Sequence, residues 1–181
     1  MSRKNEPLQD QKVVIREFHE ADADDVRKLF IRVNQLLAPD NLKDSFASYI
    51  ASSLTQEIDR ISDYYLEKNG GFWVALIDDK TVGMFGLEPS GDNTMELRRM
   101  YVDPDFRRRG IAAKMLQYAE DTCRQDNVAQ LDLSTSEVQG DALAFYRQAG
   151  YSLVHEEVAE TVSNKTIGGG IRRYHFKKKF D

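Results

Sequence analysis

Residues 106–116 read FRRRGIAAKML, and this stretch decides how the chain is interpreted. Three consecutive arginines, Arg107, Arg108 and Arg109, run into Gly110 and then into residues with helical spacing. Like charges side by side repel one another, so the run needs either full solvation or an anion to bind. A helix start leaves backbone N–H groups unpaired and carries partial positive charge. The stretch therefore predicts a phosphate cradle, with a solvated turn as the alternative.

Small residues at this turn favour the cradle. Gly110 allows close approach of the backbone, and Ala112 and Ala113 keep bulky side chains away. Arginine adds charge-assisted hydrogen bonds to phosphate oxygens. The spacing is neither Gly-x-x-x-x-Gly-Lys-Ser/Thr nor Gly-x-Gly-x-x-Gly, which excludes a nucleoside-triphosphate P-loop.

Length and composition indicate one globular domain. The chain has 181 residues, of which 41% are hydrophobic, enough for a core. A net charge of −5 argues against a general nucleic-acid binder. The single cysteine, Cys123, excludes an internal disulfide and fits a reducing compartment. No stretch approaches the roughly 20 apolar residues that span a bilayer, and the polar start lacks the apolar core of a signal peptide. We therefore expect a cytoplasmic protein.

The apolar periodicity predicts a single mixed α/β domain over residues 13–180, preceded by a flexible tail at 1–12. Asp22 is the expected N-cap of the first helix. The expected strands cover 13–18, 72–77, 81–87, 94–102, 128–135, 151–158 and 172–180, with a turn at 89–93. The expected helices cover 21–40, 42–68 (one helix or two), 110–125 and 141–150. The order is β-α-α-β-β-β-α-β-α-β-β.

Two linked segments carry a family resemblance. The strand and arginine turn, MYVDPDFRRRGIA, and the downstream segment ALAFYRQAGY at 142–151 resemble the GNAT superfamily of acyl-CoA-dependent N-acetyltransferases. The signature of that family is Gln/Arg-x-x-Gly-x-Gly/Ala after a strand, and its element order fits nearly the whole chain. The stretch YYLEKNGGFWVALIDDKTVGMFGLEP further resembles camello-type members, without the membrane segment that some of them carry.

The resemblance implies a site for acetyl-CoA. Its pyrophosphate would lie on the backbone N–H groups of residues 108–113, and its pantetheine arm would pair with the free edge of the strand that ends at Val102. Gln139 stands where the family often has Asn and would reach the pantetheine arm. The implied cofactor-binding residues are Met100, Tyr101, Val102, Arg107, Arg108, Arg109, Gly110, Ile111, Ala112, Ala113 and Gln139.

Acetyl transfer requires a neutral amine as the attacking group. An alkyl amine has a pKa of about 10.4, so removing its proton near neutral pH costs about 4 kcal/mol. The resemblance implies Glu96, eleven residues before Arg107, as the base that takes this proton directly or through water. Alternatively, Glu96 is an exposed strand residue that pairs with Arg98 or Arg99 and has no catalytic role.

The departing thiolate of coenzyme A requires a proton or a hydrogen bond. Tyr146 matches the family tyrosine that supplies it, and a phenol is a suitable acid for a thiolate. The alternative is a core aromatic, because Phe145 is adjacent and one of the two rings must face inward. The oxyanion of the tetrahedral intermediate would be held by the backbone N–H of Met100 or Tyr101.

The leading hypothesis is an N-acetyltransferase that moves an acetyl group from acetyl-CoA to a primary amine by direct attack. The acceptor would be a small molecule or a protein, and the carboxylates within 42–68 and 157–170 suggest a cationic one. Transfer of another acyl group and a non-catalytic CoA sensor are the alternatives. His19, His155 and His175 are far apart in the chain, so no metal site is expected. Neither a nucleic acid nor a membrane is expected as partner, and a homodimer is compatible with the sequence.

Overall fold

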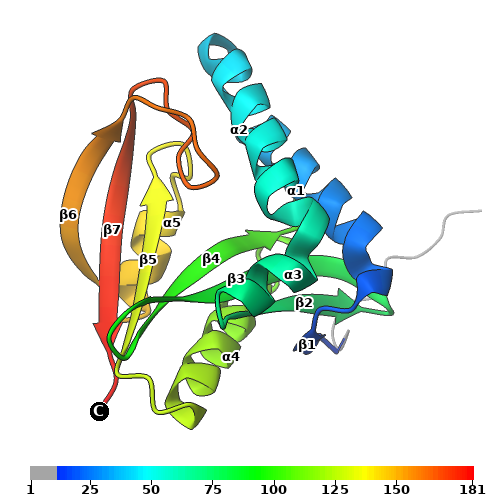
Figure 1. The fold of residues 1–181 in the computed structure, drawn as a ribbon, viewed down its shortest axis with the longest axis vertical. Helices are drawn as coiled ribbons and strands as arrows, with labels where there is room; N and C mark the ends of the chain where they lie inside the picture. Colours follow the sequence, from blue (N-terminus) through cyan, green and yellow to red (C-terminus); the bar gives the residue numbers. More distant parts are fainter. Residues whose placement is uncertain (1–11) are drawn as a thin grey trace, which may run out of the picture.

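The computed structural model describes residues 12–181 and has the predicted order of strands and main helices (Figure 1). The tail predicted for 1–12 lies outside the described residues, apart from its last residue. The strands are β1 (Val14–Glu17), β2 (Gly71–Ile77), β3 (Lys80–Gly91), β4 (Thr94–Val102), β5 (Gln130–Ser136), β6 (Ser152–Ala159) and β7 (Ile171–Lys179). The α-helices are α1 (Ala23–Leu37), α2 (Lys43–Gln56), α3 (Ile61–Glu67), α4 (Ile111–Gln125) and α5 (Ala142–Gln148).

The strands form one seven-stranded sheet in the order β1-β2-β3-β4-β5-β7-β6. Neighbouring strands are antiparallel except β4 and β5, which run parallel. Their register joins Thr94 to Gln130 and ends where Leu97 faces Leu133. Beyond that point the two strands separate, as Figure 1 shows. The last residues of β4 therefore present an edge that β5 does not cover.

Helices cover both faces of this sheet. Helices α1, α2 and α3 pack on one face, whereas α4 and α5 pack on the other (Figure 1). The alternation along β2 shows both contacts, since Trp73 and Ala75 join the core of α4 while Phe72 and Val74 join the core of α1–α3. A strand buried on both faces reads as a continuous apolar run, which is how FWVALI appears in the sequence.

Two local expectations were wrong. The turn expected at 89–93 is shorter, because β3 continues to Gly91 and only two residues connect it to β4. Asp22 is the N-cap residue of α1, as predicted, but its side chain makes no capping hydrogen bond to the helix. Its carboxylate accepts hydrogen bonds from Arg16 at 2.7 Å and from the backbone N–H of His19 at 2.8 Å instead. A 3₁₀ turn before α1 directs the side chain toward these donors.

The helical region at 42–68 forms two helices. A 3₁₀ turn (Ile58–Arg60) interrupts it after Glu57, whose side chain is fully buried. Tyr65 of α3 donates a hydrogen bond to this carboxylate at 2.7 Å, and its ring lies against Gly86 of β3.

Replacing Gly86 with alanine should destabilise the protein. The new methyl group would lie 2.6 Å from a carbon of the Tyr65 ring, so the ring must shift within a packed core. We expect a loss of about 1–3 kcal/mol in the free energy of unfolding, measured by urea denaturation. Gly91→Ala on the same strand is the control, because its nearest neighbour would be 4.0 Å away. Equal urea midpoints for the two variants would contradict this packing.

Candidate functional site

A cavity of about 670 Å³ opens where β4 and β5 separate. The end of β4, the arginine turn, the start of α4 and residues from β5 to α5 line it. The structure brings together almost all of the predicted cofactor-binding residues on its wall, namely Met100, Tyr101, Val102, Arg107, Arg108, Gly110, Ile111, Ala112, Ala113 and Gln139. Arg109 is the exception. Its guanidinium lies over the Phe106 ring at 4.8 Å and donates to the carbonyl of Asp105 at 3.2 Å.

The arginine turn ends in an uncapped helix. Gly110 precedes α4 with φ 74° and ψ 9°, in the left-handed region that glycine adopts without strain, and no side chain caps the helix. Arg108 is also left-handed, with φ 60°. The first turn of α4 contains no acidic residue, so its backbone N–H groups meet no acidic side chain from that turn. This end of the cavity is suited to an anion.

Tyr146 belongs to both the core and the cavity. Its ring packs against Tyr151 and Phe176, with centroid distances of 5.8 Å and 6.1 Å. Its hydroxyl lies 3.8 Å from the sulfur of Met100 at the cavity wall. Burial raises the pKa of Tyr146 well above its ordinary value, so the phenol stays protonated and can donate a hydrogen bond at neutral pH.

Glu96 lies in a second, smaller cavity of about 100 Å³. It faces Asp132 of β5 in the paired part of the two strands, just before they separate. Its carboxylate accepts a hydrogen bond at 2.9 Å from Lys165, which lies in the loop between β6 and β7. Glu96 thus forms an ion pair with Lys165, and the expected pairing with Arg98 or Arg99 is wrong.

A bulge in β4 explains where these two arginines go. Met84 faces Tyr101 and Gly86 faces Arg98, so an extra residue of β4 is accommodated between these pairs, and Arg99 has φ 54°. In a regular strand consecutive side chains point to opposite faces. Here both guanidinium groups reach Glu57, at 2.8 Å from Arg98 and 2.7 Å from Arg99.

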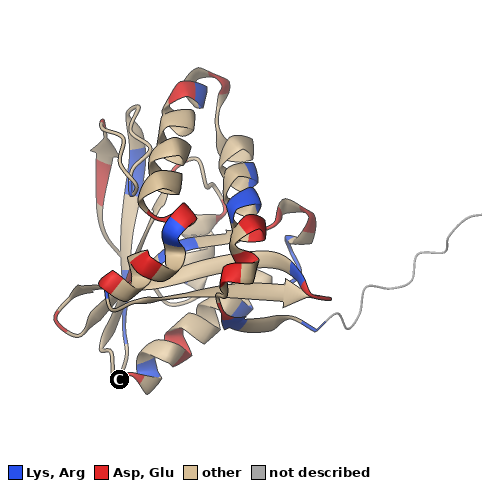
Figure 2. Ribbon diagram, turned by 45° about the vertical axis from the view of Figure 1, so that its right-hand side comes forward, with Lys and Arg blue, Asp and Glu red and all other residues tan. Residues whose placement is uncertain are grey.

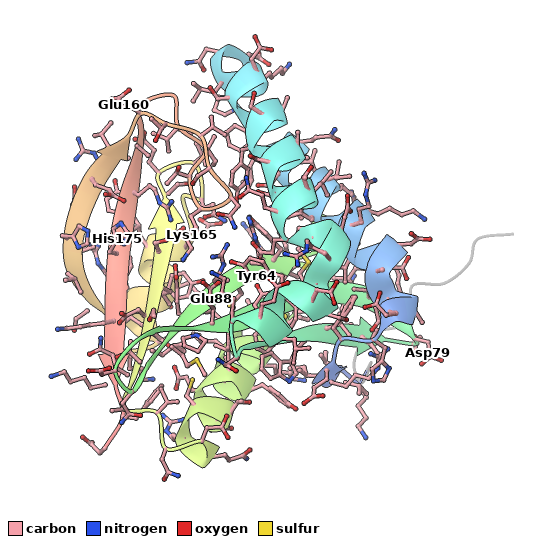
Figure 3. All side chains as sticks on the ribbon, viewed as in Figure 1. Tyr64, Asp79, Glu88, Glu160, Lys165 and His175 are labelled. Carbon is pink, nitrogen blue, oxygen red and sulfur yellow. The ribbon has the colours of Figure 1, made fainter. Side chains whose placement is uncertain are left out.

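Further charged groups adjoin the ion pairs of Glu57 with Arg98 and Arg99. Arg98 also binds Glu88 of β3 at 3.0 Å, and Tyr64 donates to the same carboxylate at 2.9 Å. Lys165 approaches Glu88 to 3.6 Å from the other side, so the groups meet on the sheet face that α2 and α3 cover (Figure 3). Sequence reasoning missed Glu57 and Glu88, since nothing in their local sequence distinguishes them from surface glutamates.

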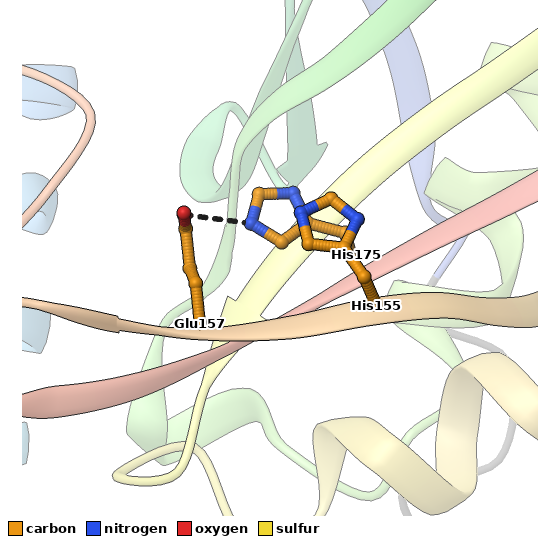
Figure 4. Close-up of side chains that lie close together, drawn as sticks. All are labelled: His155, Glu157 and His175. Atoms are coloured by element: carbon orange, nitrogen blue, oxygen red, sulfur yellow. Dashed lines mark hydrogen bonds and ion pairs between the residues drawn. The ribbon is translucent and has the colours of Figure 1, made fainter.

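Two histidines that are remote in the sequence are neighbours in space. His155 of β6 faces His175 of β7, with ring centroids 4.1 Å apart, and Glu157 lies 2.8 Å from His175 (Figure 4). The hydrogen bond from His175 holds the pKa of Glu157 below its usual range. These side chains offer ligand atoms within 4.8 Å of one another and could hold a metal ion. Pairing of β6 with β7 brings these distant positions together, which their spacing in the chain does not indicate, and the expected absence of a metal stays a prediction.

Comparison with known sequences identifies the family. The sequence model described as "Acetyltransferase (GNAT) family" matches residues 36–151. The chain is 33% identical over 117 residues to "Probable N-acetyltransferase camello" of Xenopus tropicalis, covering 59% of this chain and 53% of that protein. It is 32% identical over 121 residues to "N-acetylaspartate synthetase" of Danio rerio, covering 66% and 43%. The chain thus spans about half the length of the curated relatives it matches.

A solved structure shares the fold. The PaiA N-acetyltransferase of Thermoplasma acidophilum in complex with coenzyme A superposes with a TM-score of 0.71 at 18% identity, over 93% of this chain and 99% of that one. The chain belongs to the GNAT acetyltransferase family and carries an acyltransferase domain of that family. The camello-type resemblance is confirmed by the relative of that name. Within the described part of the chain, no helix has the length and apolarity that a membrane crossing requires.

Replacing Glu57 with glutamine should strongly destabilise the fold. Burial raises the pKa of Glu57, but attraction to Arg99 and Arg98 outweighs it and holds that pKa below its ordinary value. The carboxylate therefore stabilises the protein above its unfolded pKa, and this stability is lost as the pH falls through the lowered folded pKa. An amide leaves the buried guanidinium of Arg99 without an anion and that of Arg98 with Glu88 alone, so we expect a loss of about 3–5 kcal/mol.

Urea denaturation at several pH values measures this loss. Glu67→Gln is the matched control, because Glu67 pairs with Arg60 at the exposed end of α3 and its loss should change little. The wild-type stability should fall in acid more steeply than that of Glu57→Gln. Parallel pH profiles for the two proteins would show that Glu57 is not held as the anion.

Proposed function

We propose that the protein transfers an acetyl group from acetyl-CoA to a primary amine by direct attack, without a covalent enzyme intermediate. The observation that carries this proposal is the 670 Å³ cavity at the separation of β4 and β5. An uncapped helix start and two arginines lie at one part of it, and the buried Tyr146 hydroxyl lies at another. Membership in the GNAT family supports the same chemistry.

The donor would extend along this cavity. Its pyrophosphate would accept hydrogen bonds from the backbone of residues 108–113, with added charge from Arg107 and Arg108. Its pantetheine amides would pair with the β4 edge beyond Leu97, as an added strand does. Gln139 lies on the walls of both cavities, where Thr135 donates to its side-chain oxygen at 2.7 Å and orients the amide.

The reaction forms one carbon–nitrogen bond and breaks one carbon–sulfur bond. The amine nitrogen attacks the thioester carbonyl, and a backbone N–H of Met100 or Tyr101 would stabilise the oxyanion. The intermediate then expels the thiolate, to which Tyr146 would donate a hydrogen bond or a proton that it regains from solvent. Glu96 would accept the amine proton directly or through water, and it is the single carboxylate among the described residues that line the smaller cavity.

Tyr146→Phe and Glu96→Gln should each lower kcat by about 10²- to 10⁴-fold, because each removes a proton-transfer group. Binding of acetyl-CoA, measured by titration calorimetry, should be retained, since neither change touches the arginine turn. Turnover is measured as release of free thiol, with mass spectrometry of an amine panel to identify the acetylated product. Tyr118→Phe is the matched control, because this tyrosine lies partly exposed on α4.

The outcomes separate the parts of the proposal. A calorimetric titration without heat would overturn acetyl-CoA as the donor. Tight binding of acetyl-CoA without acetylation of any amine would favour a coenzyme A sensor over an enzyme. Full turnover by Tyr146→Phe would remove that residue from the mechanism and leave the transfer itself in place.

A further inference from the structure

The smaller cavity adjoins the larger one, on the side of the opening away from α4. The two share a wall at the opening between β4 and β5, made by Leu37, Leu97, Arg99, Tyr101, Ser134, Thr135, Val138 and Gln139. A donor bound along the β4 edge would bring its thioester to this shared wall. With a volume of about 100 Å³, the smaller cavity fits a small molecule or the end of a larger one.

Among the charged side chains that line this cavity, the basic ones outnumber the acidic ones. Arg98, Arg99, Lys165 and Arg173 line it, against the single carboxylate of Glu96. Along α1–α3, by contrast, acidic and basic residues are interspersed (Figure 2). The carboxylates that suggested a cationic acceptor therefore do not dominate the cavity, because Glu57, for example, is buried behind it against two arginines.

Arg98, Arg99 and Lys165 already have carboxylate partners. Glu57 binds both arginines, and Lys165 lies 2.9 Å from Glu96. These pairs fix the shape of the wall but leave little charge for a ligand.

Arg173 of β7 differs from the other three. Its guanidinium donates to the hydroxyl of Ser134 and to the backbone carbonyl of Lys165. Among the residues that the structure describes, no carboxylate forms an ion pair with it. Glu157 faces it on β6 but binds His175 instead, at 2.8 Å. Arg173 is thus a partly buried cation, lining a cavity, whose partners here are both neutral.

A charge in such a place favours a bound anion. Removing a cation from water is costly unless an anion compensates it, and the planar fork of a guanidinium matches the two oxygens of a carboxylate. Glu157 and Glu96 attract Arg173 only from beyond ion-pair distance, so its guanidinium can still bind one negative charge on a ligand. Burial lowers the pKa of Arg173, yet arginine remains protonated at neutral pH.

We propose that the acceptor is a small amine that also carries a carboxylate, such as an amino acid, and that Arg173 binds this carboxylate while the amine faces the thioester. This inference rests on the proposed acetyl transfer and names the substrate class for it. Arg173 is here a specificity residue, because it holds a part of the acceptor that does not react.

The test compares each L-amino acid with its own carboxamide, which keeps the side chain and the amine but removes the negative charge. We expect wild-type kcat/KM to favour the acids by about 10- to 100-fold, the effect of one charge-assisted contact. The chemistry opposes this preference, because a nearby carboxylate makes the amine harder to deprotonate. Arg173→Gln should bring the acid-to-amide ratio close to one by raising KM for the acids. The Kd of acetyl-CoA should not change, and the rates with amides should fall less than those with the acids.

Two further variants make the result specific. Arg172→Gln is the matched control, because the adjacent Arg172 points to the opposite face, where it pairs with the exposed Glu156 at 3.1 Å. It should keep the wild-type ratio. Arg173→Lys keeps the positive charge but loses the planar guanidinium, so its acid-to-amide ratio should lie between those of the wild type and Arg173→Gln. If Arg173→Gln does not fold, the ratios of the wild type and of Arg173→Lys decide the question.

Equal use of acids and amides by the wild type would overturn the inference and leave acetyl transfer intact. So would an unchanged ratio in a folded Arg173→Gln that binds acetyl-CoA. A clear preference for aminoalkylphosphonates over the matching amino acids would also overturn the assignment to a carboxylate. Failure to acetylate either class, together with no heat from acetyl-CoA, would instead overturn the proposed function and this inference with it.

Discussion

The site depends on Glu57 and the two consecutive arginines that it binds. Side chains of neighbouring strand residues normally point to opposite faces, and here a bulge turns Arg98 and Arg99 to the same one. A fully buried carboxylate between two guanidinium groups offsets the cost of burying all three charges. Because the bulge falls just beyond the last paired residue, Leu97, it lies where β4 leaves β5. One polar cluster thus supports both the opening in the sheet and the wall of the smaller cavity.

The opening divides the site into two electrostatic environments. On the side of α4, the uncapped helix start and the exposed arginines are suited to a highly charged, solvated group such as a pyrophosphate. On the side of the β6–β7 loop, the charges are largely paired and partly buried, so a single unpaired cation can discriminate between ligands. Such a division suits an enzyme that binds a large donor by its phosphates and a small acceptor by one charged group.

Much of the fold and of the larger cavity could be predicted from the sequence. The periodicity located the main strands and helices, and the arginine turn with its glycine located the uncapped start of α4, because both signals are local. Tyr146 could be placed by its motif, although its position at the Met100 sulfur could not. Arg109 shows the limit of a local pattern, since its neighbour Phe106 draws the guanidinium away from the cavity.

By itself, the sequence determined the class of fold, the family and the location of the arginine turn, because each depends on residues that are close together in the chain. Only the tertiary structure decided which charges are compensated. Glu57 meets Arg98 and Arg99 across 41 and 42 positions, and Lys165 meets Glu96 across 69. Ion pairs form between residues that the sheet and its loops bring together, so the local sequence does not indicate which carboxylate binds which cation. For the same reason, only the tertiary structure shows that Arg173 donates its hydrogen bonds to two neutral groups and not to a carboxylate.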